Sequence, residues 1–363
     1  MKPLKLLLFA MLLAVAGIGS AEESGERPSY SIPVLGDIHY DRPDCHDMEW
    51  VNAKMSKDLR QIRNYIRVTE LNTPELFRQV ERNAATRLEP VPFVIQMGDF
   101  TEGLCGSREL QGQLFSHALA AVKNSFKRPL YLVRGNHDVT GPGAWEAGND
   151  VLLPYLRELR NDPETSWNYT VDCGEDRFLF FESMRPDLGW LKQTLAESAG
   201  KRHVFLVTHY PILPYNYRAH WGMLSKNPNQ ETERRELLSL LEKHNVMILS
   251  AHLHMLSLID RKTANGTTVQ MSVSSVVNRR DSLPSKVMEG VEAYTPELAA
   301  ERDAANRNLE WRQSLIGENQ PYATRFYKAE FDGYAVLEVY PDRVVMQFYN
   351  LAGTEPVLTM RLK

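Results

Sequence analysis

The sequence predicts an α/β fold: a two-sheet β-sandwich of mixed strands flanked by helices. Five apolar runs of four to six residues are typical of strands buried on both faces, and they alternate with longer stretches of helical pattern. Three further pairs of runs flank turn signals, which indicates antiparallel hairpins beside the parallel strands. Each of the five buried runs ends in polar or charged side chains, and ligands collect at the carboxyl ends of strands in open α/β sheets.

The start of the chain is expected to be a signal peptide over residues 1–21. Lys2 and Lys5 precede an apolar run over 6–18, and the small residues of 19–21 suit a signal peptidase. A buried N-terminal helix or an uncleaved anchor is the alternative, although the run is short for a bilayer span. We therefore expect an exported protein, periplasmic or secreted, with one domain over 22–363 and no stable membrane anchor.

The buried runs follow one another in a regular order, each with its own polar cluster. They are 31–35 before Asp37 and His39, 92–97 before Asp99, 129–133 before Asn136, His137 and Asp138, 203–207 before His209, and 246–249 before His252 and His254. All nine polar side chains are thus expected at one edge of the fold.

The remaining elements are predicted from caps and turns. Helical pattern covers 75–88, 107–125, 143–160, 187–198 and 230–244, and the first of these helices begins after the cap signal Thr73-Pro74. Hairpins are expected over 167–173 with 177–182, 256–261 with 267–273, and 334–340 with 343–349 near the C-terminus. The segments 40–74, an insertion, and 210–230 are expected to be long loops, while 285–325 is charged and partly helical.

The polar clusters suit a pair of transition-metal ions. Two carboxylates, one amide and four imidazoles are too many for one tetrahedral zinc, which takes four ligands. Mixed carboxylate and imidazole donors favour first-row transition metals over calcium, and an aspartate can bridge two ions through its two oxygens. The seven candidate ligands are Asp37, His39, Asp99, Asn136, His209, His252 and His254.

The motifs D-x-H, G-D, G-N-H-D, H and A-H-x-H, in this order, resemble those of the calcineurin-like metallophosphoesterase family. The resemblance implies the family's two-sheet sandwich and two metal ions, such as Mn, Fe or Zn. One ion would be held by Asp37, His39 and His254, the other by Asn136, His209 and His252, with Asp99 between them. His137 would face the substrate and Asp138 would orient His137. Ala251 replaces the usual glycine, and Tyr40 does not fill the position of the tyrosine that binds iron in purple acid phosphatases.

Such a pair of ions implies a phosphohydrolase. In-line attack by a metal-bridging hydroxide would cleave a phosphate ester, and His137 would aid the leaving group. The substrate would be a small molecule, either a phosphomonoester or a phosphodiester, and the oligomeric state stays open. Two alternatives are a nuclease of the same superfamily and a non-catalytic metal-binding scaffold. The net charge of −4 gives no basic excess for a nucleic-acid partner.

Three cysteines allow one bridge and one thiol. Cys45 lies six residues after His39, and Cys105 lies six residues after Asp99, so two loops that leave the sheet side by side would bring them together. We expect a Cys45–Cys105 disulfide and a free Cys173, with three free thiols as the alternative.

Two sets of side chains are candidates to contact substrate beyond the metal ions. One consists of aromatic and imidazole residues after His209, which either line a substrate site or pack their loop onto the domain: Tyr210, Tyr215, Tyr217, His220 and Trp221. The other consists of three arginines that could meet an anionic group: Arg42, Arg279 and Arg280.

Overall fold

The computed structural model describes residues 27–301 and 308–363. The expected signal peptide, 1–21, lies outside the described residues. Within the described part, no helix has both the length and the apolar character needed to cross a membrane.

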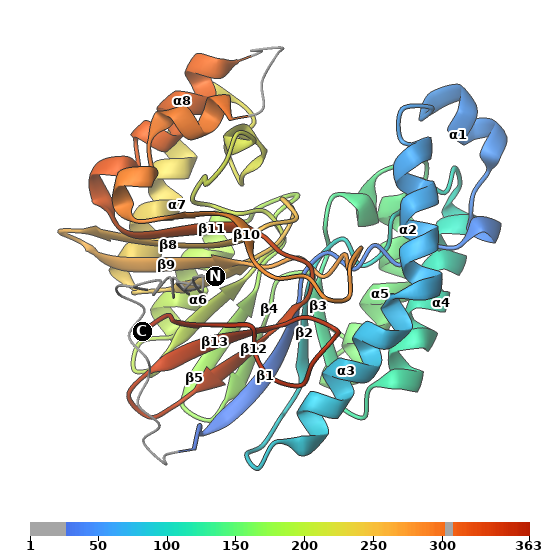
Figure 1. Cartoon of the computed structure of the whole chain (residues 1–363), viewed down its shortest axis with the longest axis horizontal. Helices are drawn as coiled ribbons and strands as arrows, with labels where there is room; N and C mark the ends of the chain where they lie inside the picture. The colour runs from blue at the N-terminus through green and yellow to red at the C-terminus, as the bar shows by residue number, and fades with distance from the viewer. Residues whose placement is uncertain (1–26, 302–307) are drawn as a thin grey trace, which may run out of the picture.

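Two β-sheets lie face to face at the centre of the molecule, as the sequence predicts (Figure 1). The six-stranded sheet has the order β14-β13-β12-β1-β2-β3, and the eight-stranded sheet has the order β10-β11-β8-β9-β7-β6-β5-β4. The strands are β1 (Tyr30–Leu35), β2 (Val94–Met97), β3 (Leu130–Val133), β4 (Tyr169–Cys173), β5 (Asp176–Phe180), β6 (Val204–Val207), β7 (Met247–Ser250), β8 (Leu256–Thr263), β9 (Gly266–Ser272), β10 (Ser285–Glu289), β11 (Ala323–Glu330), β12 (Tyr334–Val339), β13 (Val344–Tyr349) and β14 (Leu358–Arg361).

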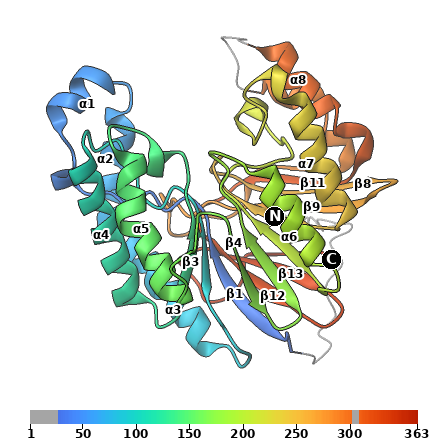
Figure 2. The same cartoon turned by 180° about the vertical axis from the view of Figure 1, so that it is seen from behind.

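Helices cover the outer faces of both sheets (Figure 2). The α3–α5 group lies against the six-stranded sheet, while α6 and α7 lie against the eight-stranded sheet. The helices are α1 (Met48–Lys54), α2 (Leu59–Leu71), α3 (Thr73–Thr86), α4 (Arg108–Ser125), α5 (Ala144–Arg160), α6 (Leu188–Glu197), α7 (Glu231–Lys243) and α8 (Leu309–Gly317).

The alternation of side chains along buried strands explains the layers. In β5, Phe178 and Phe180 join the large core that includes the inner faces of the sheets, whereas Leu179 faces the core beneath α6 and α7. Successive side chains of a strand point to opposite faces, so a run that is apolar throughout can bury both. The five strands predicted from buried apolar runs, the five predicted helices and the three predicted hairpins are confirmed within a few residues of their predicted bounds.

The segment 40–74 was expected to be a loop, and this expectation is wrong. It contains α1 and α2, and α2 buries Ile62, Tyr65, Val68 and Thr69. These positions repeat at three to four residues and form one stripe on a helix whose other residues are mostly polar or charged. Because seven of the 13 residues of α2 are polar or charged, the segment has a polar composition although one face of the helix packs on the domain.

The segment 285–325 is partly helical within its described residues, 285–301 and 308–325, as expected, and it also contains strands. It includes β10, the 3₁₀ turns Val291–Ala293 and Pro296–Ala300, α8 and the start of β11. β10 and β11 extend the eight-stranded sheet, and β14 extends the six-stranded sheet beyond the predicted C-terminal hairpin. β10 and β14 are edge strands without a fully buried residue, so their apolar signal in the sequence is weak.

The predicted Cys45–Cys105 disulfide is not formed. The two residues do pack together, in a small buried cluster with Leu114, so the two loops lie side by side as expected. All three cysteines are nevertheless thiols, and the Cys105 thiol donates to the carbonyl of Gly103 at 3.6 Å. Burial raises the pKa of Cys45 to about 11, which keeps its thiol protonated and unreactive.

Candidate metal centre

The candidate ligands lie on turns that follow the carboxyl ends of strands from both sheets. β1, β2 and β3 lead into Asp37, Asp99 and Asn136, while β6 and β7 of the other sheet lead into the histidine motifs. The first two turns are joined by backbone hydrogen bonds, because the amides of Ile38 and His39 both donate to the carbonyl of Asp99. The site is therefore built where the two sheets open toward the same edge.

Four candidate ligands adopt a backbone conformation that L-residues rarely use. The φ angles are 47° at His39, 48° at Asp99, 75° at His252 and 51° at His254. Residues held in the left-handed region cost of order 1 kcal/mol or more and cluster at functional sites. The surrounding fold thus imposes turns that aim these side chains inward.

Two glycines make room for these turns. A Cβ atom on Gly98 would lie 2.7 Å from Nδ1 of His209, and one on Gly135 would lie 2.1 Å from Oδ1 of Asp99. Both contacts are too close for any larger residue. The glycine before Asp99 and the glycine before Asn136 are therefore steric requirements of the site.

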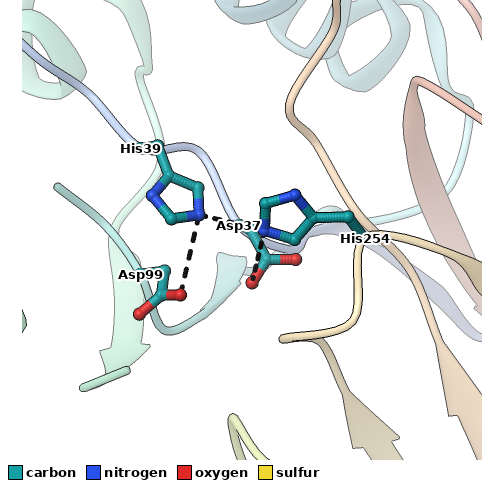
Figure 3. Close-up of side chains that lie close together, drawn as sticks. All are labelled: Asp37, His39, Asp99 and His254. Atoms are coloured by element: carbon teal, nitrogen blue, oxygen red, sulfur yellow. Dashed lines mark hydrogen bonds and ion pairs between the residues drawn. The ribbon is translucent and has the colours of Figure 1, made fainter. Parts of the chain in front are cut away.

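One group of ligands consists of Asp37, His39, Asp99 and His254 (Figure 3). Nε2 of His39 lies 3.1 Å from Nε2 of His254 and 3.6 Å from Oδ2 of Asp99. Nε2 of His254 lies 3.9 Å from Oδ1 of Asp37. The four side chains converge from β1, β2 and the turn after β7.

A second group consists of Asp99, Asn136, His209 and His252. Nε2 of His209 lies 3.3 Å from Oδ2 of Asp99, 3.1 Å from Oδ1 of Asn136 and 3.2 Å from Nδ1 of His252. Asp99 belongs to both groups through the same oxygen, Oδ2. The structure thus brings together all seven candidate ligands, with Asp99 between the two sets.

The donor atoms fit transition-metal ions. Metal–ligand bonds of about 2.0–2.2 Å place neighbouring ligand atoms roughly 3.0–3.5 Å apart, close to most of the separations in both groups. Oδ2 of Asp37, a buried carboxylate oxygen, has no hydrogen-bond partner among the described residues. An uncompensated buried oxygen beside clustered imidazole nitrogens is the arrangement a cation stabilises.

The His137 ring lies beside the first group, and a carboxylate that the motifs did not assign holds it. Nδ1 of His137 lies 2.8 Å from the carbonyl oxygen and 3.2 Å from Oε2 of Glu102. Oε2 of Glu102 also accepts from Nδ1 of His39 at 2.8 Å. The backbone N–H of His137 donates to Oδ1 of Asp99 at 2.8 Å. Glu102 therefore positions both a candidate ligand and the ring expected to face the substrate.

Asp138 does not orient His137 as expected. Its carboxylate accepts from the backbone amides of Phe100, Thr101 and Gly135 at 2.8–3.1 Å. Asp138 thus fastens the turns that carry Asp99 and Asn136. Glu102 lies three residues after Asp99 in the sequence, on the same turn. Its position near a motif does not indicate which side chain its carboxylate contacts.

The local charges favour ionised carboxylates. Burial alone raises the pKa of Glu102, but the His137 and His39 rings outweigh it and lower the value to about 2. Burial likewise opposes ionisation of Asp99, and the His209 and His137 charges hold its pKa well below the usual range. Both groups are carboxylates at neutral pH, as metal binding requires.

Aromatic side chains border the ligands. The Tyr65 ring, from α2, stacks on His39 with centroids 4.2 Å apart, and the Tyr210 ring lies 4.5 Å from His252. Trp221 lies 5.7 Å from His252 and is partly exposed. In contrast, Tyr215 is fully buried and packs the loop onto the domain. Tyr215 therefore packs the loop, whereas Tyr210 and Trp221 lie beside a candidate ligand.

The three candidate arginines have other partners. Arg42 pairs with Asp44 at 2.9 Å on the surface. The Arg280 side chain donates to Asn72 at 2.8 Å, and the backbone amide of Arg279 donates to Asp332 at 3.0 Å. None of these contacts involves a candidate ligand.

Comparison with known proteins decides the family. The profile of the calcineurin-like phosphoesterases matches residues 30–256 of this chain. The chain belongs to the calcineurin-like phosphoesterase family. As a metallophosphoesterase, it carries its buried His/Asp groups where the family motifs place them. No curated protein sequence matches the chain.

Solved structures share the fold of this phosphoesterase at low identity. Purple acid phosphatase PPD1 from yellow lupin (Lupinus luteus) seeds matches with a TM-score of 0.55 and 12% identity over 93% of this chain. The match covers 54% of the lupin protein, so this chain spans about half its length. PhoD matches with a TM-score of 0.53 and 11% identity, and the match covers 93% of this chain and 72% of PhoD. GAP50, the anchor in the inner membrane complex of Plasmodium, matches at 0.51 with 13% identity, covering 93% of this chain and 89% of GAP50.

Proposed function

We propose that this chain is an exported phosphohydrolase that cleaves a small-molecule phosphate ester with two transition-metal ions. One observation carries the proposal: Oδ2 of Asp99 faces His39 at 3.6 Å on one side and His209 at 3.3 Å on the other. A buried carboxylate oxygen between two sets of imidazole nitrogens is the donor arrangement of a shared ligand.

The residues divide between two ions. Asp37, His39 and His254 would hold one, and Asn136, His209 and His252 would hold the other, with Asp99 common to both. When bound, such ions lower the pKa of a water molecule and offset negative charge that develops on phosphoryl oxygens.

His137 acts on the leaving group. Because its Nδ1 is held by Glu102, the opposite nitrogen, Nε2, is the one available to a substrate. Nε2 lies 3.5 Å from the Gln61 amide nitrogen, which is itself a donor and so does not accept the Nε2 proton. A protonated ring in this position donates its proton to the departing alkoxide oxygen.

The experiment compares metal content with turnover of two substrates. Wild type should bind two ions per chain by elemental analysis and hydrolyse both 4-nitrophenyl phosphate and an alkyl phosphate. His137→Ala should retain both ions, lose about 10²–10⁴ in kcat on the alkyl phosphate and lose less on the nitrophenyl ester, whose leaving group needs no proton. His117→Ala, an exposed histidine on α4, is the control. One ion per active chain, or metal loss in His137→Ala, contradicts the proposal.

Export and substrate class need separate tests. Intact-mass measurement of the secreted or periplasmic protein should give a chain that begins near Glu22, whereas retention of Met1 contradicts export. Competition by DNA in the phosphatase assay distinguishes the nuclease alternative, since only a nuclease would be inhibited. Parallel assays with mono- and diesters assign the phosphate ester class.

A further inference from the structure

The loop between β6 and α7, residues 208–230, borders the second group of ligands with an exposed ring. The Trp221 side chain, in the 3₁₀ turn Ala219–Trp221, is 37% exposed although its ring lies 5.7 Å from that of His252. Part of the Trp221 ring is thus accessible to solvent beside a candidate ligand. The loop therefore presents an open surface next to the candidate metal centre.

Two cations of the same loop lie on these aromatic rings. The Arg218 guanidinium lies 4.5 Å from the centroid of the Trp221 ring. Nζ of Lys226 donates to the Tyr210 hydroxyl at 2.8 Å and lies 4.5 Å from the centroid of that ring, which itself contacts His252. Each cation is thus one ring away from the same candidate ligand.

Neither cation has a carboxylate partner within the described part of the chain. Arg218 has only ring contacts through its guanidinium, with Tyr217 and Trp221, and Lys226 has only the Tyr210 contacts. Arg134 differs from both, since it pairs with Glu182 while it stacks on two tryptophans. Two uncompensated positive charges beside an anion-processing site leave donors available for a second anion.

Side chains from the region of the 3₁₀ turn Val291–Ala293 and from α8 hold this loop in place. Tyr294, Arg312 and Trp311 donate to the backbone carbonyls of Pro214, Tyr217 and Ser225 at 2.7, 3.0 and 3.1 Å. The three bonds are spread along the loop, and two of the bonded carbonyls belong to the residues directly before Arg218 and Lys226. Arg218 and Lys226 therefore lie on an anchored loop, so less conformational entropy is lost when a ligand binds there.

We propose that Arg218, assisted by Lys226, forms a second anion subsite that selects phosphate esters whose leaving group carries its own negative charge. The inference rests on the proposed function, and it deepens that function by naming the substrate class. The leaving-group anion, a carboxylate or a second phosphate, would accept from the Arg218 guanidinium beside Trp221, while the scissile phosphate occupies the metal centre. Arg218 and Lys226 are specificity residues here and take no part in the chemical step.

The test uses two non-hydrolysable ligands of one shape. Binding of 3-carboxybenzylphosphonate and 3-carbamoylbenzylphosphonate to the Mn²⁺-loaded full chain is measured by calorimetry. Wild type should prefer the carboxylate about tenfold, the scale of one charge-assisted hydrogen bond at a half-exposed site. Arg218→Met should reduce the preference to about twofold or less, and Arg218→Lys should keep part of it. Arg343→Met, an arginine stacked on Tyr340 at the β12–β13 turn, is the matched control and should keep the full preference.

The outcomes separate the two proposals. Equal binding of both ligands by wild type, or an unchanged preference in Arg218→Met, overturns the subsite while the phosphonate group still binds. If neither phosphonate binds the metal-loaded protein, the phosphohydrolase proposal fails and the subsite fails with it. Unchanged thermal unfolding of Arg218→Met shows that a lost preference is not lost folding.

Discussion

Replacing Glu102 with glutamine should weaken metal binding on one side of the site more than on the other. Glu102 is fully buried, and its Oε2 accepts from His39 at 2.8 Å and lies 3.2 Å from Nδ1 of His137. Its Oε1 accepts from the amide of Gln61 at 3.0 Å. A carboxylate satisfies all three donors, whereas an amide has one oxygen and one NH₂ group. Glu102→Gln therefore leaves one pair of donors facing each other.

The expected magnitude follows from the role of Glu102 beside a ligand. Loss of a partner that orients a metal-bound histidine typically costs 10–100-fold in metal affinity, or about 1.4–2.7 kcal/mol. The cost should fall on the ion next to His39, because His209 and His252 have no contact with Glu102. Activity should fall further than metal content, since His137 loses the same partner.

The assay is elemental analysis across a chelator titration. Glu102→Gln should release one ion at roughly 10–100-fold lower chelator concentration than wild type, while the second ion stays near its wild-type affinity. Glu182→Gln is the matched control, a buried glutamate whose partner is Arg134, and it should leave metal affinity unchanged. Wild-type affinity in Glu102→Gln, or equal loss of both ions, refutes the reasoning.

Three further predictions concern metal sharing and stability. Asp99→Ala should lose both ions more readily than any other single ligand change, since its oxygen faces both groups; retention of one ion by elemental analysis would contradict this. Burial, reinforced by the Lys363 charge, lowers the pKa of His203 to about 4 from 6.5, so stability is unaffected at pH 7 and falls as the pH drops from 6.5 to 4. This loss of unfolding free energy is at most about 3 kcal/mol, and His203→Gln should remove it when urea unfolding is compared at pH 7 and pH 4. An unchanged pH dependence in the variant would rule this out. Arg134→Met should cost about 3–5 kcal/mol in the same assay, because it leaves the buried Glu182 carboxylate without its cation, and a cost under about 1 kcal/mol would count against it.

The sequence alone determined the sandwich and the seven candidate ligands that the structure brings together, for local reasons. A short run that is apolar throughout indicates a strand buried on both faces. Asp37, Asp99 and His209 each follow such a run within two residues. The order of the motifs then identified the family, because residue types and their order along the chain can be read without knowing the fold.

Only the tertiary structure decided which side chains act through others. Glu102 meets His39 and His137 because the turn after β2 folds back onto the turns after β1 and β3, and no residue spacing encodes that contact. Asp138, adjacent to His137 in sequence, serves backbone amides instead. The helix α2 escaped detection for a related reason: its apolar stripe, including Tyr65, is narrow and has meaning only against the surface that it covers. Contacts between distant segments depend on how the two sheets pack, and this packing is fixed by the whole core rather than by any local pattern.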